Sequence, residues 1–190
     1  MEDKDTPRKK IFPLDKDRLL PFILTGIVIL LDQVTKSIIV KNWPRVGTLI
    51  KDVFNNDFLW IVHVRNPDIA FSIGRNIPEN FDFIRPVLFI VIPLLILGFL
   101  FLYYLRTDDF TRLQRWAVAG IIGGGLGNIL DRIFRPAGVV DFISVKIYGL
   151  FGWERWPVFN VADSSVVVCC IILFLTILLF PVKDKEKEKP

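Results

Sequence analysis

Two aspartates, Asp141 and Asp163, lie in stretches of the sequence that are otherwise almost entirely small or apolar. Asp141 occurs in AGVVDF and Asp163 in FNVADSSVVV. An ionisable carboxyl group near hydrocarbon is costly to bury, so such a residue indicates a functional site with a nearby partner. Two carboxyl groups that can meet share a proton, because both cannot ionise at short range. The pair therefore predicts acid–base chemistry of the kind that an intramembrane hydrolase would use.

Further polar residues lie within or beside the apolar stretches and could support such a pair: Asp32, Lys36, Asn128, Asp131, Arg132 and Asn160. Each has a structural alternative. Asp32 and Lys36 are four residues apart and could form only an ion pair along one helix face. Asn128 and Asp131 share a helix face at three-residue spacing, and Asp131 with Arg132 could lock helices together. Asn160 could be the N-cap of a helix. Residue types and spacing leave both interpretations open.

The composition is typical of a membrane protein. Of the 190 residues, 52% are hydrophobic and the mean hydropathy is +0.47, which exceeds the apolar content usual for a soluble domain. The net charge of +4 comes mostly from basic ends that flank apolar stretches, and this argues against nucleic-acid binding. The adjacent Cys169 and Cys170 cannot form an unstrained bridge with each other, and neither they nor the lone His63 has the spacing of a metal site. We expect no metal and no cofactor.

Four apolar stretches are long enough to cross a bilayer, which takes about 20 helical residues. The expected spans cover residues about 19–40, 83–105, 116–134 and 159–180, within one domain at 19–181. Segment 57–66, DFLWIVHVRN, has the β-branched and aromatic content of a strand, and segment 77–86 predicts a short interfacial helix. The predicted fold class is an α-helical membrane protein with four transmembrane helices and a small extracytoplasmic β-sheet region between helices one and two.

Lysine and arginine are densest in the N-terminal segment 1–18, the link at 106–115 and the C-terminal tail 182–190. Positive charge accumulates on the cytoplasmic side of a membrane, so both termini are expected in the cytoplasm. The connections at about 42–82 and 135–158 then face outward. With this topology, the polar residues named above converge at one depth near the extracytoplasmic boundary.

The third expected span contains AGIIGGGLGN, where Gly120 and Gly124, like Gly123 and Gly127, are four residues apart. Glycines at this spacing leave a helix surface without side chains, which lets a neighbouring helix approach closely. We therefore predict a close helix–helix contact along the third span.

Five strings in this order resemble the bacterial lipoprotein signal peptidases, also called signal peptidase II or prolipoprotein signal peptidase. They are LDQVTK at 31–36, VRNPDIAFSIG at 64–74, GGGLGNILDR at 123–132, GVVDF at 138–142 and FNVADSSVVV at 159–168. The second string carries Asn66, Ala70 and Phe71. The resemblance extends from about Leu20 to Phe180, so that only the charged ends of the chain lie outside it.

The resemblance implies an aspartic endopeptidase with Asp141 and Asp163 as its catalytic dyad. It places further residues at positions that bind substrate or support the site: Asp32, Lys36, Asn66, Asn128, Asp131, Arg132 and Asn160. The implied substrate is a bacterial prolipoprotein whose lipobox cysteine carries a diacylglyceryl group, with cleavage just before that cysteine. The implied setting is the bacterial cytoplasmic (inner) membrane, with membrane lipid and globomycin-type inhibitors as further partners and a monomer as the acting form.

The chain departs from the family pattern at two places. Asp68 stands where the family usually has glycine, which puts a new charge near the substrate. The segment IFRPAG at 133–138 lengthens the connection between Asp131 and Asp141, which could change how Asp141 is presented.

Two other functions agree with the composition. In a small proton-coupled transporter or channel, the acidic residues would relay protons, although the sequence has neither inverted repeats nor broken helices to support this. In a structural or assembly protein, replacing Asp141 and Asp163 would have no effect on activity.

Overall fold

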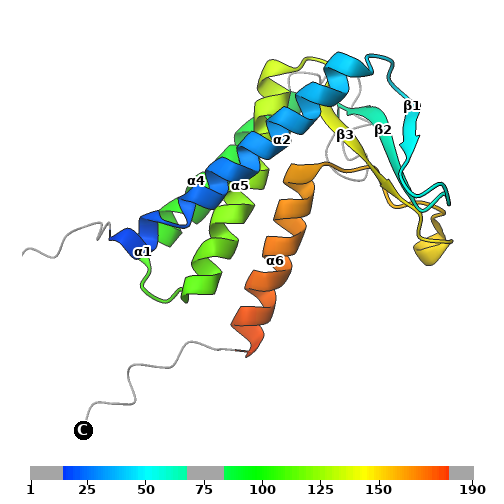
Figure 1. Cartoon of the computed structure of the whole chain (residues 1–190). Helices are drawn as coiled ribbons and strands as arrows, with labels where there is room; N and C mark the ends of the chain where they lie inside the picture. The colour runs from blue at the N-terminus through cyan, green and yellow to red at the C-terminus, as the bar shows by residue number, and fades with distance from the viewer. Residues whose placement is uncertain (1–14, 68–83, 180–190) are drawn as a thin grey trace, which may run out of the picture.

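The computed structural model describes residues 15–67 and 84–179. Four helical segments in these residues are long and apolar enough to cross a membrane, and a small sheet adjoins one end of their bundle (Figure 1). The predicted fold class is confirmed. The helical elements are α1 Lys16–Leu19, α2 Phe22–Asn42, α3 Ile84–Pro86, the π-helical η3 Val87–Val91, α4 Ile92–Arg106, α5 Arg112–Phe134, the 3₁₀-helical η4 Leu150–Gly152 and α6 Val161–Leu179.

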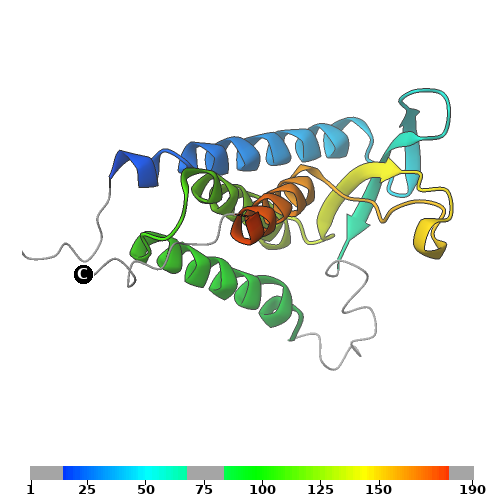
Figure 2. The ribbon, with the colours of Figure 1, turned by 90° about the horizontal axis from the view of Figure 1, so that it is seen from below.

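Helix α5 is the central helix of the bundle and packs against α2, α4 and α6. Figure 2 shows α5 and α6 between α2 on one side and α4 on the other. Glycines make these close contacts possible, as predicted. A Cβ atom on Gly124 would lie 2.4 Å from the carbonyl oxygen of Ala162 in α6, and one on Gly123 would lie 3.1 Å from backbone atoms of Thr25 in α2.

Both ends of α5 follow from its sequence. A reciprocal capping box forms at its start, where the Thr111 hydroxyl accepts a hydrogen bond from the Gln114 backbone and the Gln114 side chain accepts one from the Thr111 backbone. This motif satisfies two of the free N–H groups at a helix start. After the helix ends, Gly138 turns the chain with φ +93°, and a Cβ atom there would lie 2.4 Å from the Asn66 carbonyl oxygen. Only glycine fits this position.

The sheet has three antiparallel strands in the order β1-β2-β3: β1 Thr48–Asp52, β2 Leu59–Asn66 and β3 Val139–Val145. The strand predicted at 57–66 is confirmed as β2. Strand β3 was not predicted, and it comes from the connection between α5 and α6 rather than from the one between the first two spans. The register pairs Val64 with Asp141. A cluster of Ile39 from α2 with Val140 and Phe142 from β3 attaches the sheet to the helices.

Several predictions fall outside the described residues. These are Asp68, Ala70 and Phe71 and most of the interfacial helix at 77–86, of which the structure describes only the end, as α3. The limits of the domain at 19–181, and the part of each helix that lies within the bilayer, stay predictions.

Candidate active site

The residues predicted for the site come from α2, β2, α5, β3 and the start of α6, and they meet at the end of the bundle that adjoins the sheet. A continuous set of polar contacts connects them: Asp32, Lys36, Asn66, Asn128, Asp131, Arg132, Asp141, Asn160 and Asp163. The geometry brings all of these residues together, and their roles stay proposals.

Asn160 caps the start of α6 and also contacts both aspartates of the predicted dyad. Its Oδ1 accepts a hydrogen bond from the Asp163 backbone at 2.9 Å, and its own backbone donates to Asp163 Oδ2 at 3.1 Å. Its Nδ2 donates to Asp141 Oδ1 at 2.7 Å. From the sequence, Asn160 could be either a helix cap or a site residue. In the structure it caps α6 and also contacts Asp141.

Asp141 is almost completely buried, with 3% of its surface exposed, and it lies on β3. Its Oδ2 accepts a hydrogen bond at 3.2 Å from Nδ2 of Asn66, at the end of β2. Burial is the main cause that raises the pKa of Asp141 to about 7, and the neighbouring charge of Asp163 adds to it. The hydrogen bonds from Asn160 and Asn66 act in the opposite direction, because they favour the ionised form.

Asp163 lies in the first turn of α6 and is partly exposed. Its Oδ1 accepts a hydrogen bond at 2.7 Å from Nδ2 of Asn128 in α5. Arg132 donates to the Asn128 carbonyl oxygen at 3.3 Å, and its positive charge lies close enough to interact with both Asp163 and Asp141. The helix start, the amide donors and the guanidinium surround the Asp163 carboxyl group with hydrogen-bond donors and positive charge.

A fully buried ionic cluster lies behind the two aspartates. The Lys36 ammonium contacts Asp32 at 2.8 Å and Asp131 at 3.1 Å, and it donates to Asn128 Oδ1 at 2.9 Å. Asp32 also accepts from the Ala162 backbone at 3.0 Å, which satisfies a donor at the start of α6. The predicted ion pair of Asp32 and Lys36 therefore exists, and through Asn128 it also reaches Asp163.

Two further side chains join this cluster and were not predicted. Nε2 of Gln33 lies 3.1 Å from Asp32 Oδ2 and 3.0 Å from Asp131 Oδ1. Arg135 forms a salt bridge with Asp131 and donates to Gln33 Oε1 at 3.0 Å. The four-residue spacing of Asp131 and Arg135 is the sequence signal that indicates this pair.

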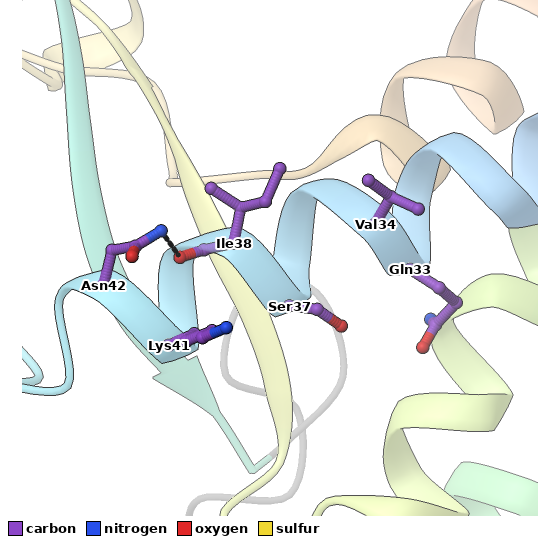
Figure 3. A pocket seen from close by; sticks show the side chains of 6 residues that line it. All are labelled: Gln33, Val34, Ser37, Ile38, Lys41 and Asn42. Carbon is purple, nitrogen blue, oxygen red and sulfur yellow. Dashed lines mark hydrogen bonds between the residues drawn. The ribbon is translucent and has the colours of Figure 1, made fainter.

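A shallow cavity of about 480 Å³ lies along α2, beside Gln33 and Ser37 and not at the two aspartates (Figure 3). One helix alone lines it: Gln33, Val34, Ser37, Ile38, Lys41 and Asn42. Within residues 15–67 and 84–179, no group of three or more His, Cys, Asp or Glu side chains has an arrangement that could hold a metal ion. The chemistry available at the site is thus that of a buried carboxyl group beside a partly exposed carboxylate.

Comparison with known proteins gives agreement across almost the whole chain. A family model described as Signal peptidase (SPase) II matches residues 24–179. The lipoprotein signal peptidase of Treponema pallidum is 40% identical over 94% of this chain and 91% of its own length. That of Treponema denticola is 44% identical over 90% of this chain and 95% of its own length.

Solved structures show the same fold. A bacterial membrane enzyme determined at 2.3 Å by the in meso method has a TM-score of 0.70 and 28% identity, covering 90% of this chain and 94% of that one. A second, determined at 1.9 Å by the same method, has a TM-score of 0.67 and 28% identity, covering 84% of this chain and 92% of that one.

Proposed function

The chain belongs to the signal peptidase II family, and we propose that it removes signal peptides from bacterial prolipoproteins as an intramembrane aspartic endopeptidase. The substrate is a prolipoprotein with a diacylglyceryl group on its lipobox cysteine, and cleavage falls just before that cysteine. One observation carries the mechanism. Asn160 contacts the carboxyl groups of Asp141 and Asp163 at the same time, so a single residue holds two carboxyl groups of different environment side by side.

Asp163 acts as the general base in this proposal. Its carboxyl group is the more exposed of the two, lies at the start of α6 and accepts a hydrogen bond from Asn128. The carboxylate takes a proton from a bound water, which attacks the carbonyl carbon of the scissile peptide bond.

Asp141 acts as the general acid. Burial raises the pKa of its carboxyl group to about 7, so a large fraction of the group is protonated near neutral pH. The group donates this proton to the carbonyl oxygen as the tetrahedral intermediate forms. When the intermediate collapses, the proton that Asp163 took from the water passes to the leaving nitrogen and the C–N bond breaks. Asp141 regains its proton from the hydroxyl group of the intermediate as the new carboxyl group forms.

The charge pattern and the fold support the proposed placement in the membrane. Helix α1, the α4–α5 connection and the end of α6 lie at the end of the bundle opposite the sheet (Figure 1). With both termini in the cytoplasm, the two aspartates lie near the extracytoplasmic boundary of the inner membrane. The diacylglyceryl group of a substrate can then stay in the bilayer while its peptide bond reaches water. We expect the protein to act as a monomer and globomycin-type cyclic peptides to inhibit it.

Cleavage of a diacylglyceryl-modified prolipoprotein peptide by the purified full chain tests this function. The wild type should cut it just before the modified cysteine and should leave the unmodified peptide intact. Asp141→Asn and Asp163→Asn should each lower the rate about 10⁴-fold, because each removes one of the two groups that transfer protons.

Asp17→Asn is the matched control, since Asp17 forms only an exposed ion pair with Arg112. It should cleave at the wild-type rate. Thermal unfolding in detergent must show that all three variants are folded. Full turnover by a folded Asp141→Asn or Asp163→Asn would exclude the dyad, and equal cleavage of the unmodified peptide would exclude the substrate class.

A further inference from the structure

Arg135, in the segment where the chain departs from the family spacing, has contacts that none of the predicted roles explains. We propose that Arg135 is a positioning residue, which neutralises the buried charge of Asp131 and thereby fixes the start of β3 and the carboxyl group of Asp141. The inference rests on the function proposed above.

The charges of the buried cluster balance only when Arg135 is counted with it. Asp32, Asp131 and Lys36 have no exposed side-chain surface, so two carboxylates share one ammonium away from the protein surface. A buried charge without a partner is strongly unfavourable. The Arg135 guanidinium contacts Asp131 and is itself only 20% exposed. It supplies the second positive charge and makes the cluster neutral.

The contacts of Arg135 hold its side chain in place. Its guanidinium donates to Gln33 Oε1 at 3.0 Å and to Ser37 Oγ at 3.2 Å, both on α2. Its backbone N–H donates to the Asp131 carbonyl oxygen at 2.7 Å, and its carbonyl oxygen accepts from Gly138 at 2.9 Å. Arg135 thus joins the end of α5 to α2 and to the turn that leads into β3.

Asp131 transmits this constraint to the proposed acid. Its Oδ1 faces Arg135, while its Oδ2 accepts a hydrogen bond from the Val140 backbone at 3.0 Å. Val140 directly precedes Asp141 on β3 and is fully buried. Gln33 also contacts Oδ1 and Lys36 also contacts Oδ2, so the carboxylate is held at both oxygens. Arg135 supplies the positive charge at the oxygen that faces away from the strand, and in this way it helps to fix the strand.

The same arrangement gives Arg135 an electrostatic effect on Asp141. The charged groups that interact with that carboxyl are Asp163 on α6, Lys36 on α2 and Arg132 on α5. Asp32, Asp131, Arg65 and Arg135 interact in turn with these groups or with one another. Removing the Arg135 charge makes these surroundings more negative by one charge. Negative charge disfavours ionisation, so the pKa of Asp141 should rise.

Arg135→Gln and Arg135→Lys test the proposal in the full-length enzyme with the lipidated peptide. Arg135→Gln should lower kcat about a hundredfold, as expected for a displaced reacting group, with KM little changed. The loss of activity at high pH should move to higher pH. Arg135→Lys keeps the charge but loses the planar fork, so it should keep the wild-type pH profile with a smaller loss of kcat.

Arg112→Gln is the matched control, because Arg112 lies at the other end of α5 with its side chain 83% exposed. It should change neither kcat nor the pH profile. Hydrogen exchange of the Val140 amide gives a readout that does not depend on activity, and Arg135→Gln should accelerate it. A folded Arg135→Gln with wild-type kcat, pH profile and Val140 exchange would overturn the proposal. If the Val140 amide exchanges faster in Arg135→Gln but the wild type does not cleave the lipidated peptide, the result contradicts the proposed function and not the positioning role of Arg135.

Discussion

The molecule contains two clusters of charged side chains that have the same number of acidic and basic groups but differ in burial. The first, which we call the inner cluster, consists of Asp32, Lys36, Asp131 and Arg135 at the end of the helices that adjoins the sheet. The second, the tip cluster, consists of Asp57, Lys146, Glu154 and Arg155 at the far end of the sheet. Each has two acidic and two basic side chains. Side-chain exposure is 0–20% in the inner cluster and 17–66% in the tip cluster.

The two clusters connect different parts of the chain. The inner cluster binds the backbone N–H groups of Ala162 and Val140, which are next to or near the proposed catalytic aspartates. In the tip cluster, Arg155 donates to the Asp57 carbonyl oxygen at 2.8 Å and its guanidinium lies 3.7 Å from the centre of the Trp60 ring. It therefore attaches the β1–β2 turn to the connection before α6, away from the site.

Burial decides what each cluster contributes. Removing one partner from a buried ion pair leaves a charge that water cannot solvate, and this is strongly destabilising. An exposed pair contributes little, because water and salt screen it. Similar ionic contacts therefore hold the candidate site in place in the inner cluster and add only a little to the stability of the sheet in the tip cluster.

Lys36→Met gives the largest expected effect and tests the inner cluster directly. All three N–H groups of the ammonium are used within the cluster or by Asn128, so the variant leaves two buried carboxylates with one positive charge. We expect a loss of about 3–5 kcal/mol in the free energy of unfolding. Denaturant titration of the purified protein in detergent would measure it.

The control for Lys36→Met is Lys41→Met on the exposed part of the same helix, which should lose little stability. Lys36→Met combined with Asp32→Asn should recover much of the loss, because it restores the charge balance. Equal free energies of unfolding for Lys36→Met and Lys41→Met would show that burial does not make the inner cluster more important for stability than exposed charges.

The pH dependence of stability gives the next largest effect. The pKa of Asp141 rises from 3.8 to about 7 on folding, so the folded state favours the protonated form. Its contribution to stability therefore falls as pH rises from about 4 to about 7. We expect the wild type to lose about 2–3 kcal/mol more than Asp141→Asn between about pH 5 and about pH 8.

Thermal unfolding of both proteins across this pH range would measure the difference. Cleavage should also decline above about pH 7, because the proposed acid loses its proton. The same pH slope in the wild type and Asp141→Asn would contradict the raised pKa. Asp57→Asn at the tip should leave the wild-type slope unchanged.

Much of the site could be predicted because its residues lie in apolar segments, where a polar side chain is exceptional. Asn160 and Asp163 also form a local pattern, since an asparagine cap three residues before an acidic residue is typical of a helix start. Strand β3 was missed because a short apolar run does not distinguish strand from helix by itself. Its pairing with β2 depends on residues that are distant in sequence, such as Val64 and Asp141.

Arg135 was missed for a related reason. Its spacing from Asp131 allows an ion pair, but many such arginines point into solvent. What fixes its side chain is Gln33 and Ser37, about a hundred residues earlier in the chain. Local sequence thus identifies residues of the right type, whereas the packing of α2 against α5 decides which of them belong to the inner cluster.

Asp57→Asn gives the smallest expected effect and tests the tip cluster. The substitution removes the carboxylate that contacts Lys146 at 2.7 Å and Arg155 at 3.4 Å, but it keeps the carbonyl oxygen that Arg155 also binds. Asparagine also tolerates the positive φ of 65° at this position. We expect a loss of at most about 1 kcal/mol in the free energy of unfolding, with cleavage unchanged.

The same denaturant titration and the lipidated-peptide assay would measure both quantities for Asp57→Asn. High salt should screen the ion pairs of the wild-type tip cluster, so the difference in the free energy of unfolding between Asp57→Asn and the wild type should become smaller. A loss as large as that of Lys36→Met would mean that the tip cluster behaves as if buried. A fall in cleavage without a fall in stability would mean that the tip of the sheet acts on the site. Either result would contradict the proposed difference between the inner cluster and the tip cluster, because burial would then not decide which cluster matters for stability or for cleavage.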